Sequence, residues 1–232
     1  MSEGSAKIWD PEWVTNDHRQ AWIAQRFQLG MLLRQSGNNN AAVVSTLLDL
    51  VPRERFVARG FLAQAYDNLA LPAGEGQTIS APEVVCQMTS ALELSAEQRV
   101  LEVGTGSGYQ AAVLSHLVHN VFSIERFDTL AQTAQARLSL LGRENVRQFV
   151  GDGTQGLPAL APFDRIILTA APEQIPPVLF DQLALDGILV APVGQQNKAQ
   201  HLVRCRKTVA GIQTEVLGKV RFVPLVASMP QR

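Results

Sequence analysis

The feature that most constrains the fold is an apolar run that ends in a turn with three alternating glycines. Residues 100–109 read Val-Leu-Glu-Val-Gly-Thr-Gly-Ser-Gly-Tyr, and this pattern predicts a buried strand that leads straight into a helix. Glycines allow positive φ angles and let a ligand approach the main chain closely. Doubly wound α/β sheets bind their ligands at such turns, at the carboxyl ends of the strands. The segment therefore predicts an α/β fold with a ligand site at Gly104, Gly106 and Gly108.

Downstream of residue 80, strand-like and helix-like segments alternate. The hydrophobic periodicity predicts strands over residues 99–103, 121–125, 146–150, 165–168, 188–193, 202–207 and 215–222, and helices over 82–92, 109–117, 130–141 and 176–183. Such alternation predicts a mostly parallel sheet covered by helices on both faces. No helix separates the last two strands, so we expect them to pair as a hairpin. The predicted fold class is a doubly wound, Rossmann-like α/β sheet with an antiparallel C-terminal element.

The N-terminal part of the chain is organised differently. Helices are predicted over residues 16–35 and 41–50, the second stopped near Pro52. Residues 53–78 show poor periodicity and carry several glycines among large apolar residues, which predicts a long, irregular but ordered loop. We therefore expect residues 1–79 to form a helical cap and a substrate-side loop, packed on a core of residues 80–232.

The composition narrows the choice of partners. Lys and Arg total 20 against 21 Asp and Glu, a balance that gives no sign of a nucleic-acid or anionic membrane partner. No apolar run is long enough to span a bilayer. Cys86 and Cys205 form neither a metal-binding spacing nor a disulfide framework. We therefore expect no nucleic acid, membrane or metal partner, two buried unpaired cysteines, and a cytoplasmic location.

The chemistry of the glycine turn favours S-adenosylmethionine over a dinucleotide. The spacing Gly-x-Gly-x-Gly fits the phosphate-binding Gly-x-Gly-x-x-Gly fingerprint poorly. Glu102 lies just before the turn, where a carboxylate would repel a pyrophosphate and attract a cationic amino-acid group. S-adenosylmethionine carries an ammonium and a sulfonium and no phosphate. The alternative is a plain strand–turn–helix connection, which needs neither the dense glycines nor the acid.

Acidic residues also follow the next two strands. Glu125 ends the second strand, where an acid can accept hydrogen bonds from ribose hydroxyls; the alternative is a solvated glutamate at a strand end. Asp152 and Gly153 follow the third strand, where Asp152 can accept from an adenine amino group and the Gly153 amide can contact a ring nitrogen. Alone, Asp-Gly is only a turn signal, but its place in this pattern favours the cofactor.

Longer motifs resemble those of the protein-L-isoaspartate O-methyltransferase family. They are Val-Pro-Arg-Glu-Arg-Phe-Val at 51–57, Tyr-Asp-Asn at 66–68, Leu-Pro-Ala-Gly-Glu-Gly-Gln-Thr-Ile-Ser at 71–80, the glycine turn, Gly-Asp-Gly at 151–153, Ala-Pro-Phe-Asp at 161–164, the segment 189–194 and Arg-Phe-Val-Pro-Leu-Val at 221–226. The resemblance covers about residues 26–227. The glycine turn alone indicates only a methyltransferase. The segments around residues 77–80 and 221–225 narrow the resemblance to this one family.

This resemblance implies methyl transfer from S-adenosylmethionine to the α-carboxylate of L-isoaspartyl residues in damaged proteins and peptides, with S-adenosylhomocysteine as the product. It implies that Ser80 is the active-site serine and that Ser107 lies in the cofactor loop. It also implies a lid over the methyl group and substrate, formed by Thr78, Ile79, Ser80 and Ala81. We expect this lid to face the strand end that carries Val223 and Val226.

Other interpretations compete with these assignments. Ser80 begins a Ser-Ala-Pro-Glu sequence that predicts a capping box at the start of a helix, a role compatible with catalysis. Two residues depart from the family pattern. Many members have an aromatic residue or histidine in place of Glu83, and bacterial members often have tryptophan in place of Thr154. We expect these differences to affect the peptide-binding surface rather than the chemistry. The alternative function is a methyltransferase of the same fold that acts on a small molecule or another protein group. A binding protein that has lost turnover is a third possibility, against which the intact cofactor and lid motifs argue.

Overall fold

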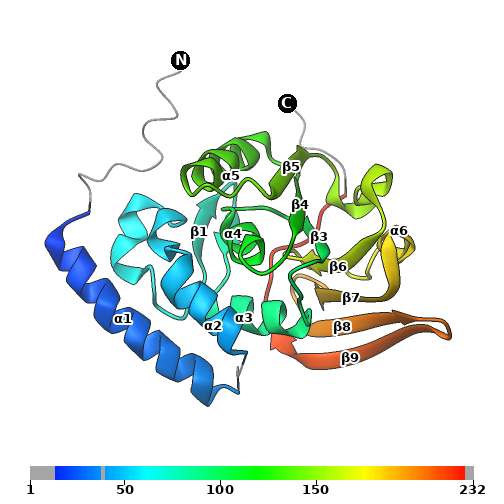
Figure 1. Ribbon diagram of the computed structural model, residues 1–232, viewed down its shortest axis with the longest axis horizontal. Helices are drawn as coiled ribbons and strands as arrows, with labels where there is room; N and C mark the ends of the chain where they lie inside the picture. Colours follow the sequence, from blue (N-terminus) through cyan, green and yellow to red (C-terminus); the bar gives the residue numbers. More distant parts are fainter. Residues whose placement is uncertain (1–13, 38–39, 228–232) are drawn as a thin grey trace.

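The computed structural model describes residues 14–37 and 40–227, and its centre is a seven-stranded sheet (Figure 1). The strands are β3 (Arg99–Val103), β4 (Asn120–Glu125), β5 (Val146–Val150), β6 (Phe163–Leu168), β7 (Leu183–Val193), β8 (Gln200–Thr208) and β9 (Gly211–Val220). They lie in the order β5-β4-β3-β6-β7-β8-β9. The first five are parallel, whereas β8 and β9 form the antiparallel hairpin that the helix-free tail predicts. The predicted fold class is confirmed.

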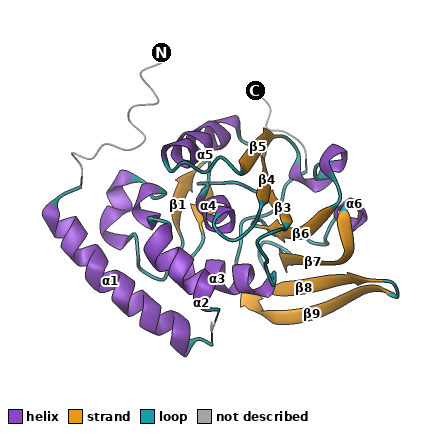
Figure 2. Ribbon diagram, viewed as in Figure 1, coloured by secondary structure: helices purple, strands orange, loops and turns teal. Residues whose placement is uncertain are grey.

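The two faces of the sheet are covered by different elements. Because side chains alternate along a strand, Val100 faces one hydrophobic cluster and Leu101 the other. The first cluster includes side chains of α3 (Pro82–Ala91) and α4 (Tyr109–Ser115), and the second includes Leu179 of α6 (Pro177–Asp181). The remaining helix of this part, α5 (Asp128–Leu140), packs beside β4 and β5 (Figure 2). The central strands β3, β4 and β6 are therefore buried on both sides, as their near-continuous apolar sequences require, whereas the edge strand β9 is largely exposed.

The N-terminal helices extend the first of these clusters. The long helix α1 (Asn16–Gln35) runs along the outside of the molecule (Figure 1), and the short helix α2 (Ala41–Ser45) continues into a π-helical turn, Thr46–Leu50. Trp22 and Leu33 of α1 are buried in the same cluster as Val100. The Trp22 indole also donates a hydrogen bond to the Leu62 carbonyl at 2.8 Å. Among the described residues, no helix is both long and apolar enough to cross a bilayer.

The segment between α2 and α3 is more regular than predicted. It contains two 3-10 turns, Arg53–Arg55 and Arg59–Gln64, followed by a hairpin of β1 (Leu71–Gly74) and β2 (Gln77–Ile79). The prediction of an irregular loop is wrong for this hairpin. Its strands are too short to show a two-residue alternation, and Gly76 with φ +67° occupies the turn. The predicted order of the segment agrees with its buried side chains, such as Phe56 and Tyr66.

Candidate active site

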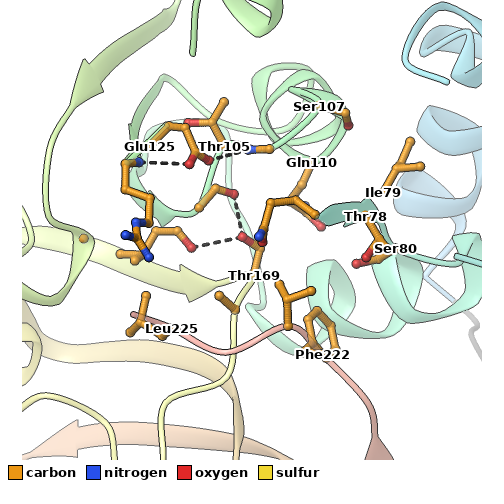
Figure 3. Close-up of a pocket in the computed structure, with 18 of the residues that line it drawn as sticks. Thr78, Ile79, Ser80, Thr105, Ser107, Gln110, Glu125, Thr169, Phe222 and Leu225 are labelled. Carbon is orange, nitrogen blue, oxygen red and sulfur yellow. Dashed lines mark hydrogen bonds between the residues drawn. The ribbon is translucent and has the colours of Figure 1, made fainter. Parts of the chain in front are cut away.

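A pocket opens at the carboxyl ends of β3 and β4, on the side toward β6. At this place the strand order reverses, since β4 and β6 flank β3 on opposite sides, and open α/β sheets bind ligands at such a switch point. Four chain segments contribute most of the lining: residues 77–80, 103–107, 124–127 and 222–226. Figure 3 shows Glu125 on one side of the pocket and Thr78, Ile79 and Ser80 on the other.

The glycine turn is shaped by close contacts that exclude side chains. Gly104 has φ +101°, and a Cβ atom there would lie 2.3 Å from the Thr169 hydroxyl oxygen. Gly108 has φ +88°, and a Cβ atom there would lie 3.1 Å from the Ala134 Cβ. Gly104 and Gly106 line the pocket, whereas Gly108 starts α4 behind it. The turn thus presents bare backbone to the pocket, as the sequence pattern predicts.

Glu125 is held by the backbone at the end of β4. One carboxylate oxygen accepts from the Gly106 N–H at 2.8 Å, and the other accepts from the N–H groups of Arg126 and Phe127 at 2.9 and 3.0 Å. The side chain lines the pocket although only 5% of its surface is exposed (Figure 3). The three bonds fix the carboxylate in one orientation at the mouth of the glycine turn.

Glu102 does not line the pocket. It points to the opposite face of β3 from Val103, is fully buried, and accepts a short hydrogen bond from the Ser123 hydroxyl. Burial raises the pKa of Glu102 to about 8, an effect that the Ser123 bond opposes and the nearby Glu125 reinforces. Ser123 is bonded in turn to Thr105, which lines the pocket, at 2.5 Å. Within the described residues, Glu102 is therefore linked to the pocket by hydrogen bonds only through Ser123 and Thr105.

The turn after β5 places Gly153 but not Asp152 against the pocket. Gly153 lines it, and a Cβ atom there would lie 2.6 Å from Val103. One oxygen of Asp152 accepts from the backbone N–H and the hydroxyl of Thr154, at 2.9 and 2.7 Å. Thr154, one of the departures from the family pattern, therefore holds the Asp152 side chain and does not itself line the pocket.

The lid segment lies across the pocket from the glycine turn. Thr78, Ile79 and Ser80 line the pocket, and Ala81 lies just outside the lining. The predicted capping box is wrong, because the N-cap of α3 is Ala81 and Ser80 makes no capping bond. Asn68 caps the helix instead: its oxygen accepts from the Glu83 N–H at 3.0 Å, and its amide donates to the Glu83 carboxylate at 2.8 Å. The Ser80 hydroxyl is thus not engaged in a helix cap.

The C-terminal tail closes the pocket from below in Figure 3, where Phe222 and Leu225 are seen. Val223 and Val226 line it together with Pro224. The tail is pinned to the loop after β6, because the Ala171 N–H donates to the Val223 carbonyl and the Leu225 N–H donates to the Ala171 carbonyl, both at 2.8 Å. The structure thus brings the lid and the tail to one pocket, as expected.

Comparison with known proteins identifies the family. The sequence model of the protein-L-isoaspartate(D-aspartate) O-methyltransferase family matches residues 25–229. This chain belongs to that family.

Named relatives support the same conclusion. The protein-L-isoaspartate O-methyltransferase of Xanthobacter autotrophicus is 49% identical over 203 residues, 88% of this chain and 92% of that protein. The enzyme of the same name from Rhodospirillum rubrum is 49% identical over 211 residues, 90% of this chain and 96% of its own length.

Solved structures share the fold. A protein-L-isoaspartate O-methyltransferase superposes with a TM-score of 0.77 at 27% identity, covering 86% of this chain and 65% of that chain. A second, described as a putative protein-L-isoaspartate O-methyltransferase from Plasmodium falciparum in complex with S-adenosyl-L-homocysteine, has a TM-score of 0.73 at 24% identity over 86% of this chain and 97% of that one. The second likeness bears on the fold alone.

Several lining residues of this methyltransferase were not singled out from its sequence. They are Met88, Thr105, Tyr109, Gln110, Arg126, Phe127 and Thr169. Arg126, Phe127 and Thr169 directly follow strands that end at the pocket edge, so the rule that ligands bind beyond strand ends could have found them. Met88 and Gln110 lie on helices whose orientation the local pattern does not contain.

The residues present fit S-adenosylmethionine. The turn has no side chain at Gly104 or Gly106 to obstruct a ligand at the main chain. Glu125 presents a fixed carboxylate to hydroxyl groups, and Ile124 and Phe127 add apolar surface for a ring. Among the described residues, no group of His, Cys, Asp or Glu side chains is arranged to hold a metal ion.

Proposed function

We propose that this chain transfers a methyl group from S-adenosylmethionine to the α-carboxylate of L-isoaspartyl residues in damaged proteins and peptides. The observation that carries the proposal is the meeting of two motifs in one pocket: the glycine turn with Glu125, and lid residues 78–80 with the tail of residues 222–226. Family membership supports the same reaction. S-adenosylhomocysteine is the second product.

The cofactor end of the proposal uses the glycine turn and the ends of β4 and β5. Glu125 accepts hydrogen bonds from the ribose hydroxyls, while Gly104, Gly106 and Ser107 allow the amino-acid part to approach the backbone. Gly153 contacts the adenine directly, with Asp152 accepting from the adenine amino group after a small reorientation. Gly108 and Glu102 act indirectly, since neither lines the pocket: Gly108 by starting α4, and Glu102 through Ser123 and Thr105.

The acceptor end consists of the lid and the tail. Ser80 faces the reacting carboxylate, flanked by Thr78, Ile79 and Ala81, while Val223 and Val226 bound the substrate from the other side. A carboxylate is ionised at neutral pH, so the reaction needs no general base. One carboxylate oxygen donates an electron pair to the methyl carbon as the carbon–sulfur bond breaks. The bond electrons neutralise the sulfonium, and no proton moves.

Catalysis in this scheme comes from alignment and from the exclusion of water. Carboxylate oxygen, methyl carbon and sulfur must lie in line, and a misplacement of about 1 Å costs on the order of 100-fold in rate. The strand β2 contains Thr78 and Ile79 of the lid, so the hairpin β1–β2 is suited to hold the lid over the pocket. The expected division at residue 79, between the helical cap with its substrate-side loop and the cofactor-binding core of residues 80–232, is part of this proposal.

The partners proposed are isoaspartyl-containing proteins and peptides, in the cytoplasm. Cys86 and Cys205 are buried and unpaired, which suits a reducing compartment. The alternative remains a methyltransferase of the same fold that acts on a small molecule or another protein group.

A pair of peptides that differ only in an isoaspartyl or a normal aspartyl linkage tests the proposal. The isoaspartyl carboxylate is one methylene closer to the main chain, so a rigid lid should align only one of the two. We expect methylation of the isoaspartyl peptide to be at least about 100-fold more efficient, and the ester to release methanol in base. Equal rates on both peptides, or transfer to neither, would contradict the isoaspartyl assignment and favour the alternative.

A further inference from the structure

A fully buried arginine lies behind the wall of the pocket. Arg53, in the 3-10 turn Arg53–Arg55, is the largest side chain of the described structure with no exposed surface. No carboxylate lies within ion-pair distance of it among the described residues. Its Nε and Nη1 atoms also have no hydrogen-bond partner in that part of the chain. Burial lowers the pKa of Arg53, and the neighbouring Tyr109 opposes the shift.

The contacts of Arg53 join the two halves of the active site. Its Nη2 donates to the Ser80 carbonyl at 2.8 Å and to the Leu69 carbonyl at 3.4 Å. Its guanidinium carbon lies 4.9 Å from the centre of the Tyr109 ring, a cation–π distance. Ser80 belongs to the lid, and Tyr109 is the first residue of α4, directly after the glycine turn. Both line the pocket, so Arg53 touches the acceptor side and the cofactor side from behind.

Stability alone does not account for an arginine at this place. Burying a charge without a carboxylate partner is costly, and an apolar side chain of similar volume is often as stable or more stable. What an apolar residue lacks is a donor nitrogen, here Nη2, that reaches two carbonyls while the planar guanidinium stacks on a ring. The position is therefore better explained by the geometry that the arginine imposes on its neighbours.

The hydrogen bond from Arg53 to the Ser80 carbonyl fixes the orientation of the Ser80–Ala81 peptide at the lid. A trans peptide is planar, with its C=O and N–H pointing in opposite directions. Because Arg53 holds the Ser80 carbonyl toward the interior, the Ala81 N–H points away from Arg53. Neither the Ser80 nor the Ala81 N–H donates to an acceptor within the described residues. Both donors therefore have no partner in the described structure, and Ser80 lines the pocket while Ala81 adjoins it in the chain.

We propose that Arg53 is a positioning residue that fixes the Ser80–Ala81 peptide and the Tyr109 ring relative to each other, so that the lid amides meet the acceptor carboxylate in line with the methyl group. This inference rests on the proposed function and adds to it the element that sets the lid geometry. Asn68 assists from the same side, since it caps α3 two residues after Ala81.

The test compares Arg53→Met and Arg53→Lys with a matched control at the other end of α3. Arg165 donates to the carbonyls of Leu92 and Glu93, which directly follow the last residue of α3. This is the end of α3 opposite the lid. Arg165→Met therefore removes an arginine that braces the same helix without touching the pocket. Each variant is assayed for kcat and KM with the isoaspartyl peptide, affinity for S-adenosylhomocysteine by calorimetric titration, melting temperature, and amide hydrogen exchange over residues 78–81.

We expect Arg53→Met to lower kcat by about 10- to 100-fold while the affinity for S-adenosylhomocysteine changes less than about threefold. Exchange of the lid amides should accelerate in this variant. Arg53→Lys should fall between wild type and Arg53→Met, because an ammonium can donate to a carbonyl but has no plane to stack on the Tyr109 ring. Arg165→Met should keep kcat within about threefold and leave lid exchange unchanged, whatever it does to the melting temperature.

An unchanged kcat in Arg53→Met, or an equal loss in Arg165→Met, overturns the inference. If Arg53→Met does not fold, Arg53→Lys decides: a lower kcat at an unchanged melting temperature supports the inference, and a wild-type kcat overturns it. If the wild-type protein methylates neither peptide, the proposed function fails by itself. Lid exchange then decides the role of Arg53 alone, because it needs no turnover.

Discussion

At the scale of single residues, two glutamates near the ends of neighbouring strands lie in different places relative to the pocket. The sequence predicted a cofactor role for both, and only Glu125 lines the pocket. Glu102 lies two residues from Val100 and therefore faces the same side of the sheet, away from Val103. The two-residue alternation was available in the sequence, and it would have predicted the burial of Glu102. The alternation within one strand could not predict the hydrogen-bond partner of Glu102, because Ser123 comes from the neighbouring strand.

The buried carboxyl of Glu102 should make folding depend on pH. The unfolded chain releases this proton near the usual glutamate value of about 4.3, whereas the folded state keeps it up to a pKa of about 8. Between these values the folded state binds more protons, so stability falls as pH rises. We expect Glu102→Gln, which mimics the protonated acid, to remove a slope of up to about 1.4 kcal/mol per pH unit. Urea unfolding from pH 5 to pH 8 measures it, and parallel curves for variant and wild type would contradict it.

At the scale of elements, the sequence predicted the helices and strands of the core well because each is a long apolar pattern bounded by turn residues. The helix over residues 16–35 and the strand over 146–150 have the predicted limits. The limits of β7 and β9 differ, because pairing with a neighbouring strand extends each one before its apolar stretch: Leu183 of β7 pairs with Phe163, and Gly211 of β9 pairs with Thr208. The hairpin β1–β2 was missed since neither strand is long enough to show a period.

The cap of α3 shows a second limit of local patterns. Ser80-Ala81-Pro82-Glu83 reads as a capping box, yet the capping side chain is Asn68, which is 15 residues before Glu83. A tertiary contact thus takes the place of the local one, and the Ser80 carbonyl is bonded to Arg53 instead. No pattern within one helix predicts it.

This cap assignment predicts a contrast between two alanine variants. Asn68→Ala should lower the free energy of unfolding by about 1 kcal/mol, the usual value of an N-cap. Ser80→Ala should change it by less than about 0.5 kcal/mol, since Ser80 does not cap. Urea denaturation of both variants measures the difference. A larger loss for Ser80→Ala than for Asn68→Ala would restore the capping box.

At the scale of the whole molecule, the pocket is assembled from segments that are far apart in the chain. Residues 77–80 meet residues 222–226 across the ends of β3 and β4, and the tail reaches this place through its bridge from Pro224 to Ala171. The strand-end rule predicted where the glycine turn and Glu125 would lie. It could not place the tail, whose role was predicted from family resemblance. Helix orientation, which sets Met88 and Gln110 against the pocket, also required the three-dimensional structure.

Because the ligand would contact the lid, the sheet ends and the tail together, its binding should stabilise the whole molecule. A ligand present at about 100 times its Kd adds about 2.7 kcal/mol to the free energy of unfolding. For a chain of this size that corresponds to a rise in melting temperature of about 5–10 °C. We expect this shift with S-adenosylhomocysteine and none with NAD at the same concentration, because the glycine spacing does not suit a pyrophosphate.

Glu125→Gln is the matched control for that measurement. It keeps one oxygen, which can accept from the N–H groups of Arg126 and Phe127, while its NH2 group loses the bond from the Gly106 N–H. It also replaces charge-assisted bonds to the ligand with weaker neutral ones. A tenfold loss of affinity would leave about half of the thermal shift at the same ligand concentration. Differential scanning calorimetry with and without ligand measures both proteins against their own ligand-free melting temperatures. An equal shift in Glu125→Gln and wild type would contradict the ribose role of Glu125, and a shift with NAD as large as that with S-adenosylhomocysteine would contradict the choice of cofactor.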